Sequence, residues 1–277
     1  MRPLLSLSRA LLTIIVLGLC LGSGAWGADS TREKAWADLL ASRLQHGQVV
    51  WLKTADEQKV FAIYEPQRKG HGKGAVILLH DMGQHPDWPR VIAPLRNALP
   101  RHGWSTLSVQ MPILAQGASP AQYAPLLKAV NSRLQAAITY LKAEHITTVV
   151  LVGYGLGATM GAAYLTSEKD SAVRSLIGIS MGIIEGTEPS LDIASYLAKL
   201  SLPTLAIYGS RDYEWVLRSV PRLAAAGRRA STANGAEAPV FRQVEIMGAN
   251  HGYTGVTDVL TEDVLGWLDR LGQAGPE

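Results

Sequence analysis

The sequence predicts an α/β fold in three layers, with a mostly parallel central sheet and helices on both faces. Residues 74–79 and 147–152 are short, continuously apolar segments, typical of strands buried on both faces of a parallel sheet. Segments with helical periodicity alternate with such strands, which favours right-handed crossovers. The chain has 277 residues, 47% of them hydrophobic and 18% charged, which suits one large domain with a substantial core.

The first half of the chain supplies the following elements in order. Residues 31–45 predict a helix, because their spacing places Trp36, Leu39, Leu40 and Leu44 on one face. Two short strands follow around a polar turn, and the first buried strand comes after them. The expected elements are strands 48–53, 59–64 and 74–79, helix 88–99, strand 105–109, helix 122–143, strand 147–152 and a helix that ends near residue 166.

The second half continues the alternation of apolar strands and helices. Its expected elements are strands 173–180, 204–208 and 240–247, with helices 213–225 and 261–271. Residues 224–239 are rich in Ala, Arg and Gly and predict an exposed loop. We find no internal repeat, so one domain over residues 28–277 is expected.

Residues 1–27 have the composition of a secretory signal peptide. Arg2 and Arg9 precede or begin an apolar run with no acidic residue, and Ala25 and Gly27 form a small-x-small cleavage site. The apolar run is short for a membrane span, although an uncleaved N-terminal anchor is the alternative. Leu19 before Cys20 argues against lipidation, because a small residue is expected there. We expect a periplasmic or secreted protein that touches a membrane only through this segment if it stays uncleaved.

The composition of the remaining chain excludes several classes of site. Cys20 is the only cysteine, so cleavage would remove any disulfide, thiol nucleophile or thiolate metal ligand. Loss of Arg2 and Arg9 lowers the formal charge from +3 to +1, and no basic stripe indicates nucleic-acid binding. The histidines other than His251 lack metal-ligand spacing. We therefore predict no metal and no cofactor, and the partner is an unknown small molecule or protein.

A glycine-punctuated turn, Gly153-Tyr154-Gly155-Leu156-Gly157, follows the strand 147–152. A strand, such a turn and a small-residue helix form the context of a nucleophile elbow, in which a serine stands at the apex. Here the apex is Gly155, which has no side chain. An elbow nucleophile has a strained, positive-φ backbone that costs a non-glycine residue about 1–3 kcal/mol, whereas glycine adopts it readily.

Two backbone N–H groups are candidates for an oxyanion hole. Met82 lies in the loop after the strand 74–79, beside His80 and Asp81, and Leu156 begins the helix after the turn. In acyl transfer such donors stabilise a developing oxyanion. We expect His80, Asp81 and Tyr154 to line the same cleft.

Asp212 and His251 follow two later strands, in the order expected of an acid and a histidine after an elbow. An Asp212–His251 dyad could act as a general base on water or on an acidic C–H group. Two other roles explain these residues equally well. Asp212 is also suited to cap the helix that begins near residue 213, and His251 could be a loop histidine held by backbone groups.

These segments resemble the α/β-hydrolase superfamily over nearly all of residues 28–277. The resemblance rests on Ile77-Leu78-Leu79-His80, Asp87-Trp88, Ala93-Pro94-Leu95 and His102-Gly103-Trp104, which look like the region of the oxyanion loop and first helix. The stretch His85-Pro86-Asp87-Trp88-Pro89 and the serine-less elbow are similar to an uncharacterised family of exported bacterial proteins. That likeness implies a fold and a compartment, but no substrate.

Three positions depart from the enzyme pattern. Gly155 replaces the nucleophile, Gln110 stands where many relatives carry an aspartate, and Asp81 replaces the usual glycine after the oxyanion-loop histidine. A carboxylate at residue 81 would oppose a nearby anionic intermediate.

The departures lead to two hypotheses. The first is a non-hydrolytic or degenerate protein that binds a ligand or partner in the former active-site cleft. The second is a divergent hydrolase, or an enzyme that uses Asp212 and His251 without a protein nucleophile. Rescue by another hydroxyl would require hydrogen-bond reach to His251, and the candidates are Thr159, Tyr154, Ser180 and Ser210.

Overall fold

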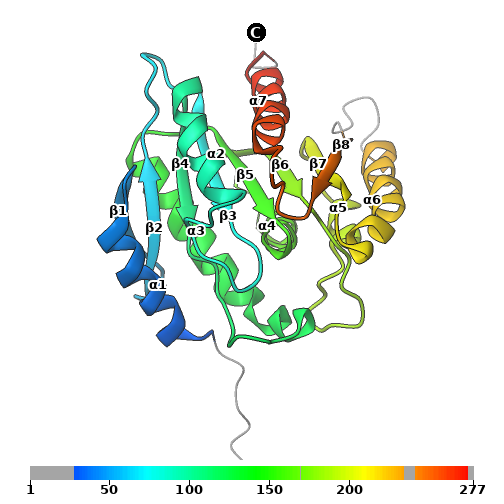
Figure 1. The fold of residues 1–277 in the computed structure, drawn as a ribbon, viewed down its shortest axis with the longest axis horizontal. Helices are drawn as coiled ribbons and strands as arrows, with labels where there is room; N and C mark the ends of the chain where they lie inside the picture. Colours follow the sequence, from blue (N-terminus) through cyan, green and yellow to red (C-terminus); the bar gives the residue numbers. More distant parts are fainter. Residues whose placement is uncertain (1–27, 169, 234–240, 274–277) are drawn as a thin grey trace, which may run out of the picture.

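The computed structural model describes residues 28–168, 170–233 and 241–273. The predicted signal segment, residues 1–27, lies outside these residues. Figure 1 shows a twisted central sheet with helices on both faces. The elements in chain order are α1 (Ser30–Arg43), β1 (Gln48–Lys53), β2 (Lys59–Glu65), β3 (Gly74–Leu79), α2 (Ile92–Ala98), η1 (Leu99–His102), β4 (Trp104–Val109), η2 (Pro120–Leu126), α3 (Leu127–Ala143), β5 (Val149–Tyr154), α4 (Leu156–Ser167), β6 (Val173–Ile179), α5 (Ile193–Leu197), β7 (Thr204–Arg211), α6 (Glu214–Ala233), β8 (Phe241–Asn250) and α7 (Thr257–Gln273).

The sheet has eight strands in the order β1-β2-β4-β3-β5-β6-β7-β8. β1 pairs antiparallel with β2, and β2 pairs antiparallel with β4, whereas the other neighbouring pairs are parallel. The predicted α/β class and mostly parallel sheet are therefore confirmed. From β3 the chain runs to β4 on one side and later returns to β5 on the other. In open α/β sheets, ligands bind at the carboxyl ends of the strands beside such a switch in strand order.

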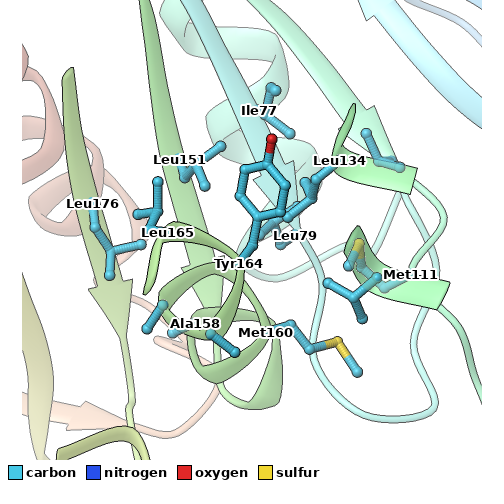
Figure 2. Packing of buried hydrophobic residues seen from close by; sticks show 14 of the residues in the cluster. Ile77, Leu79, Met111, Leu134, Leu151, Ala158, Met160, Tyr164, Leu165 and Leu176 are labelled. Carbon is cyan, nitrogen blue, oxygen red and sulfur yellow. The ribbon is translucent and has the colours of Figure 1, made fainter. Parts of the chain in front are cut away.

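The core forms two layers, one on each side of the sheet. On one side, alternate residues of the parallel strands, among them Val76 and Val152, pack against α2 and α7. On the other side, Ile77, Leu79 and Leu151 pack against α3 and α4. Figure 2 shows these three strand residues meeting Tyr164 and Leu165 of α4. The continuously apolar strands of the sequence are thus explained by burial on both faces.

Three predicted elements differ from the structure for local reasons. Residues 122–143 divide into η2 and α3, because Pro125 lacks the N–H that an α-helix would use there. Residues 88–91 precede α2 instead of forming its first turn, since Pro89 disfavours helical backbone at Trp88. The predicted loop over residues 224–239 is wrong for 224–233, which complete α6. Its consecutive alanines and arginines favour helix.

The first strands form a hairpin at the edge of the sheet that α1 covers. Phe61 and Ile63 of β2 pack against Ala37 and Leu40 of α1 as a separate small cluster. In Figure 1 this region lies at one end of the sheet, with α1 beside β1 and β2. It is set apart from the carboxyl ends of β7 and β8, which the predicted site residues Asp212 and His251 follow.

Candidate functional site

The site lies where β3, β5, β7 and β8 end. Asp81 follows β3, Gly155 follows β5, Asp212 follows β7, and His251 follows β8. Parallel strands bring these four positions to the same edge of the sheet. The fold thus brings together the residues that the sequence analysis selected.

The turn after β5 has the backbone of an elbow. Gly155 has φ +53° and ψ −121°, and α4 begins at the next residue. This left-handed region favours glycine. Gly157 is required for a different reason, because a Cβ there would lie 2.3 Å from the carbonyl oxygen of Leu79. Glycine therefore allows β3 and α4 to approach closely behind the turn.

The side chain of Asp81 fills the space in front of Gly155. A Cβ added to Gly155 would lie 2.2 Å from both Cγ and Oδ1 of Asp81. The carboxylate therefore stands where the side chain of an elbow residue would begin. The Asp81 side chain is 14% exposed, so it is held inside the site and does not extend into solvent.

The two predicted oxyanion donors converge, and Asp81 is their acceptor. The N–H groups of Met82 and Leu156 each donate to Asp81 Oδ1 over 2.7 Å. These are hydrogen bonds to an ionisable carboxylate, the stronger class of hydrogen bond when it is charged. The two N–H groups thus point at one position, as the donors of an oxyanion hole would, and the chain's own carboxylate occupies that position.

His251 lies between two carboxylates. Its Nδ1 is 2.7 Å from Oδ1 of Asp212, and its Nε2 is 3.4 Å from Oδ2 of Asp81. The side chains of His251 and Asp212 are 11% and 0% exposed. Asp81, His251 and Asp212 thus form a continuous chain of polar contacts, which we call the carboxylate triad.

Two tyrosines hold the imidazole of His251 in place. Tyr213 stacks on the ring with centroids 4.3 Å apart and an interplanar angle of 24°. Tyr154 packs at 5.1 Å, and its hydroxyl donates to the carbonyl oxygen of His251 over 3.0 Å. Tyr154 is buried and Tyr213 is 56% exposed. Tyr154 thus supports the histidine from inside, and the expectation that Tyr154 lines the cleft is corrected.

Asp212 has hydrogen-bond partners in addition to His251. Ser180 Oγ donates to Asp212 Oδ2 over 2.5 Å, and the N–H of Tyr213 donates to Oδ1 over 2.7 Å. The hydroxyl groups of Ser180 and Tyr253 lie 3.1 Å apart. Asp212 therefore combines the contact with His251 and the bond to the start of the next helix. Sequence reasoning missed Tyr253, which no motif marks.

Strained backbone accompanies this network. Ser180 and Tyr253 have φ values of +53° and +52°, which are unusual for residues other than glycine. Such strain costs about 1–3 kcal/mol per residue and persists where surrounding contacts hold it. Here the contacts place two hydroxyls beneath Asp212.

The surroundings of His251 raise its pKa to about 9. Burial alone would lower that pKa, but the hydrogen bonds to Asp212 and Asp81 and the charges of both carboxylates outweigh it. For Asp212, burial acts in the opposite direction and would raise the pKa. The hydrogen bonds from His251 and Ser180 outweigh burial and hold the pKa of Asp212 below its usual value. The two carboxylates therefore favour the protonated imidazole, a form that cannot act as the general base of the dyad hypothesis.

His80 lies beneath the site and does not line the cleft, contrary to the expectation. Its side chain is buried, and its Nδ1 lies 2.8 Å from the carbonyl oxygen of Asp81. Its Nε2 accepts the N–H of Met111 and contacts Gln110 Nε2, both at 3.0 Å. Burial lowers the pKa of His80 to about 3, so the ring is neutral. This set of contacts fixes the loop that carries Asp81.

Of the other hydroxyl candidates, two are hydrogen-bonded elsewhere and the third is buried. Ser180 Oγ is engaged with Asp212, and Ser210 Oγ accepts the N–H of Gly248. Thr159 is buried within α4, and its Oγ1 has no partner among the described residues. Among the described residues, none of these three hydroxyls is hydrogen-bonded to His251, and Asp81 is the group that faces its Nε2.

Among the residues that the structure describes, no group of three His, Cys, Asp or Glu side chains could hold a metal ion. Within the same residues, no helix is long and apolar enough to cross a membrane.

The sequence matches the model of one protein family. The family is described as "Protein of unknown function (DUF3530)", and the match covers residues 23–126 and 116–270. No curated protein matches the chain.

The fold is similar to that of solved α/β hydrolases. A putative dienelactone hydrolase from Klebsiella pneumoniae has a TM-score of 0.64 at 14% identity, covering 81% of this chain and 98% of that chain. A protein of unknown function from Agrobacterium tumefaciens, described as a putative α/β hydrolase, has a TM-score of 0.60 at 21% identity and coverages of 83% and 100%. Est1E from Butyrivibrio proteoclasticus has a TM-score of 0.58 at 17% identity and coverages of 81% and 98%. These likenesses confirm the expected α/β-hydrolase fold; identities this low carry no activity over.

Proposed function

This chain belongs to the family described as DUF3530, and we propose that it is an exported, non-hydrolytic protein that binds a small molecule or a protein partner at its former active site. The observation that carries the proposal is the position of Asp81. Its carboxylate fills the space in front of Gly155 and accepts both oxyanion-hole N–H groups.

The occupied oxyanion hole blocks acyl transfer of the serine-hydrolase type. A substrate carbonyl oxygen would need the N–H groups of Met82 and Leu156, which are bound to Asp81. Moving Asp81 aside would break those two bonds and its contact with His251. Even then, Gly155 would offer no nucleophile.

The charge of the carboxylate triad favours particular ligands. The imidazolium of His251 and the carboxylates of Asp81 and Asp212 together carry one net negative charge, which disfavours a carboxylate or phosphate placed against these three side chains. Tyr213 stacks on His251 and is 56% exposed, which leaves an aromatic face toward solvent. Neutral or cationic ligands are therefore favoured.

Export rests on residues 1–27. Their basic start, short apolar run and small-x-small site support secretion with cleavage after Gly27. Sequencing the N-terminus of the protein recovered from the periplasm tests this. A chain that begins at or near Ala28 supports export, whereas an intact Met1 in the membrane fraction contradicts cleavage.

An ester assay tests the non-hydrolytic proposal. We expect the exported protein to hydrolyse p-nitrophenyl acetate and butyrate at the background rate, with no difference from His251→Ala. Turnover above background that disappears in His251→Ala would overturn the proposal.

Native mass spectrometry tests ligand binding. We expect part of the purified protein to carry the added mass of a retained ligand, and we expect this fraction to be smaller in Tyr213→Ala. If no ligand is retained, or if Tyr213→Ala retains as much of it, binding at this site is contradicted.

One observation favours a second candidate, a hydrolase with a carboxylate nucleophile. Asp81 Oδ1 is held by two N–H groups, while Oδ2 faces His251. In such an enzyme, Oδ2 would attack an sp³ carbon that bears a halide. A new C–O bond would form an ester, and the halide would leave with its electron pair.

The second half of that reaction would use the same groups. Esterified Asp81 is uncharged, so the pKa of His251 would fall and its proton would pass to solvent. His251 could then take a proton from water as the water adds to Asp81 Cγ. The N–H groups of Met82 and Leu156 would stabilise the oxyanion. As the oxyanion collapses, His251 would return its proton to the leaving alkoxide, which departs as the alcohol. The proton left on the new carboxyl group would pass to His251, which restores the carboxylate and the imidazolium.

Isotope labelling separates the two candidates. The protein is incubated with 1-bromobutane in H₂¹⁸O, and the peptide that contains Asp81 is analysed by mass spectrometry. The binding proposal predicts neither bromide release nor ¹⁸O in Asp81. Bromide release with ¹⁸O in Asp81 of the native chain, but not of His251→Gln, would establish the carboxylate nucleophile instead.

A further inference from the structure

A second site is suggested by a cavity of about 590 Å³ between α1, the β1–β2 hairpin and α3. Figure 1 shows these elements at the β1 end of the sheet, away from the carboxyl ends of β7 and β8. The volume lies within the usual range of small-ligand sites. We propose that this cavity binds a neutral, hydroxyl-rich ligand, namely a saccharide.

An aromatic platform forms one wall. Trp51 of β1 lines the cavity and is 52% exposed, which is unusual for so large an apolar side chain. Its ring packs edge-on against the buried Phe61, with centroids 5.5 Å apart and an interplanar angle of 75°. The indole is therefore fixed on one side and open on the other. A fixed, exposed ring is suited to stack against the apolar face of a sugar.

The charged groups that line the cavity balance one another. They are Glu33, Asp38 and Asp56 against Lys34, Lys59 and Arg133. Arg133 donates to Glu33 over 2.9 Å, with side chains 11% and 15% exposed, and Lys34 pairs with Asp38 over 2.6 Å. Such a wall has no net charge to select an ion. Its donors and acceptors suit hydroxyl groups, which both donate and accept.

Gln110 supplies a buried acceptor in the wall. Its Nε2 donates to the carbonyl oxygen of Met111 over 2.7 Å and to His80 Nε2 over 3.0 Å. A flipped amide would place Oε1 against two acceptors, so the orientation is fixed. Gln110 Oε1 is consequently buried with no hydrogen-bond partner among the described residues. A buried acceptor without a donor is costly. A small displacement of the Gln110 side chain toward the cavity that it lines would bring Oε1 within reach of a ligand hydroxyl.

The same glutamine gives the proposal a distant readout. Gln110 contacts His80, and His80 Nδ1 contacts the carbonyl oxygen of Asp81. A ligand that engages Gln110 should therefore shift the NMR signals of the His80 ring. A ligand that binds elsewhere on the surface would leave those signals unchanged.

Calorimetry with defined trisaccharides tests the proposal. The neutral probes are chitotriose, maltotriose and cellotriose, and the charged controls are trigalacturonate and the chitosan trimer. We expect at least one neutral probe to bind with a Kd below about 1 mM, more tightly than either control, with shifts of the His80 signals. Failure of all three neutral probes at about 10 mM, or tighter binding of a charged control, would overturn the proposal.

Three variants locate the binding. Trp51→Ala should weaken binding at least about tenfold, because truncation of an aromatic anchor removes most of its contact. Trp51→Tyr should retain it, and both variants should fold because Trp51 is 52% exposed. Tyr213→Ala, at the former active site, should leave saccharide binding unchanged. Binding that survives Trp51→Ala but is lost in Tyr213→Ala would overturn the assignment to this cavity without affecting the proposed function.

Discussion

At residue scale, Gly155 and Asp81 have to be considered together. Gly155 relaxes the backbone of the elbow, and the carboxylate of Asp81 occupies the space that the absent side chain leaves. The carboxylate also accepts the two N–H groups that would otherwise be unpaired inside the site. The absence of a side chain at residue 155 and the position of the Asp81 carboxylate therefore depend on each other.

Restoring a serine at the elbow should fail unless Asp81 is also removed. In Gly155→Ser the new Cβ would lie 2.2 Å from Asp81 Cγ, and the backbone has φ +53°. We expect the free energy of unfolding to fall by about 1–3 kcal/mol or more. We also expect no reaction with a fluorophosphonate probe, because Asp81 still occupies the space that the serine needs.

The double variant is the informative partner. In Asp81→Ala/Gly155→Ser the carboxylate is gone, so stability should partly recover and the serine should react with the probe. Strictly additive losses in stability would show that the two side chains do not compete for the same space. If the probe labels the single variant Gly155→Ser, Asp81 does not block the elbow, and the same conclusion follows.

At the scale of elements, the segment that leads from β3 into α2 is held by Arg96, which lies in the last turn of α2. Arg96 of α2 donates to Asp87 over 2.7 Å and to the carbonyl oxygen of His46 over 2.7 Å. It also pairs with the buried Glu65 of β2 over 3.2 Å. This buried network ties α2, β2 and the His85–Trp88 segment together.

Removing Arg96 should destabilise the protein strongly. In Arg96→Leu, the buried Glu65 would keep only its pair with the more exposed Arg68, and we expect the free energy of unfolding in urea to fall by about 3 kcal/mol. Arg218→Ala is the control, since the Arg218–Glu214 pair is exposed on both sides and should contribute less than about 1 kcal/mol. Equal losses in the two variants would contradict a structural role for the buried network.

The elements themselves were largely predictable, and their boundaries less so. The apolar runs before His80 and before Tyr154 mark strands because burial on both faces leaves no polar alternation. The break at Pro125 and the extension of α6 beyond residue 225 depend on local backbone chemistry that an apolar pattern does not register.

At the scale of the whole molecule, parallel topology explains why the site could be assembled from sequence. Asp212 and His251 are far apart in the chain, but each follows a strand, and all carboxyl ends of the parallel strands share one edge. The direction of the Asp81 side chain could not be predicted in this way. It is set by the N–H groups of Met82 and Leu156, which come together only in the folded chain.

The raised pKa of His251 predicts a pH dependence of stability. The group has a pKa of about 9 when folded and about 6.5 when unfolded, so its contribution is complete below about pH 6.5 and is lost as the pH rises through 9. The expected loss is on the order of 3 kcal/mol. Chemical unfolding at pH 6 and pH 9.5 should show a steeper decline in the native chain than in His251→Gln. Parallel declines would mean that His251 titrates alike in both states.

The central claim is that Asp81 has taken the place of a nucleophile beside His251. The most direct measurement is an NMR titration of the His251 ring in the native chain and in Asp81→Asn. The account predicts a pKa of about 9 in the native chain and a clearly lower pKa in the variant, because one of the two carboxylates is neutralised. An ordinary histidine pKa in the native chain, or an unchanged one in Asp81→Asn, would contradict it.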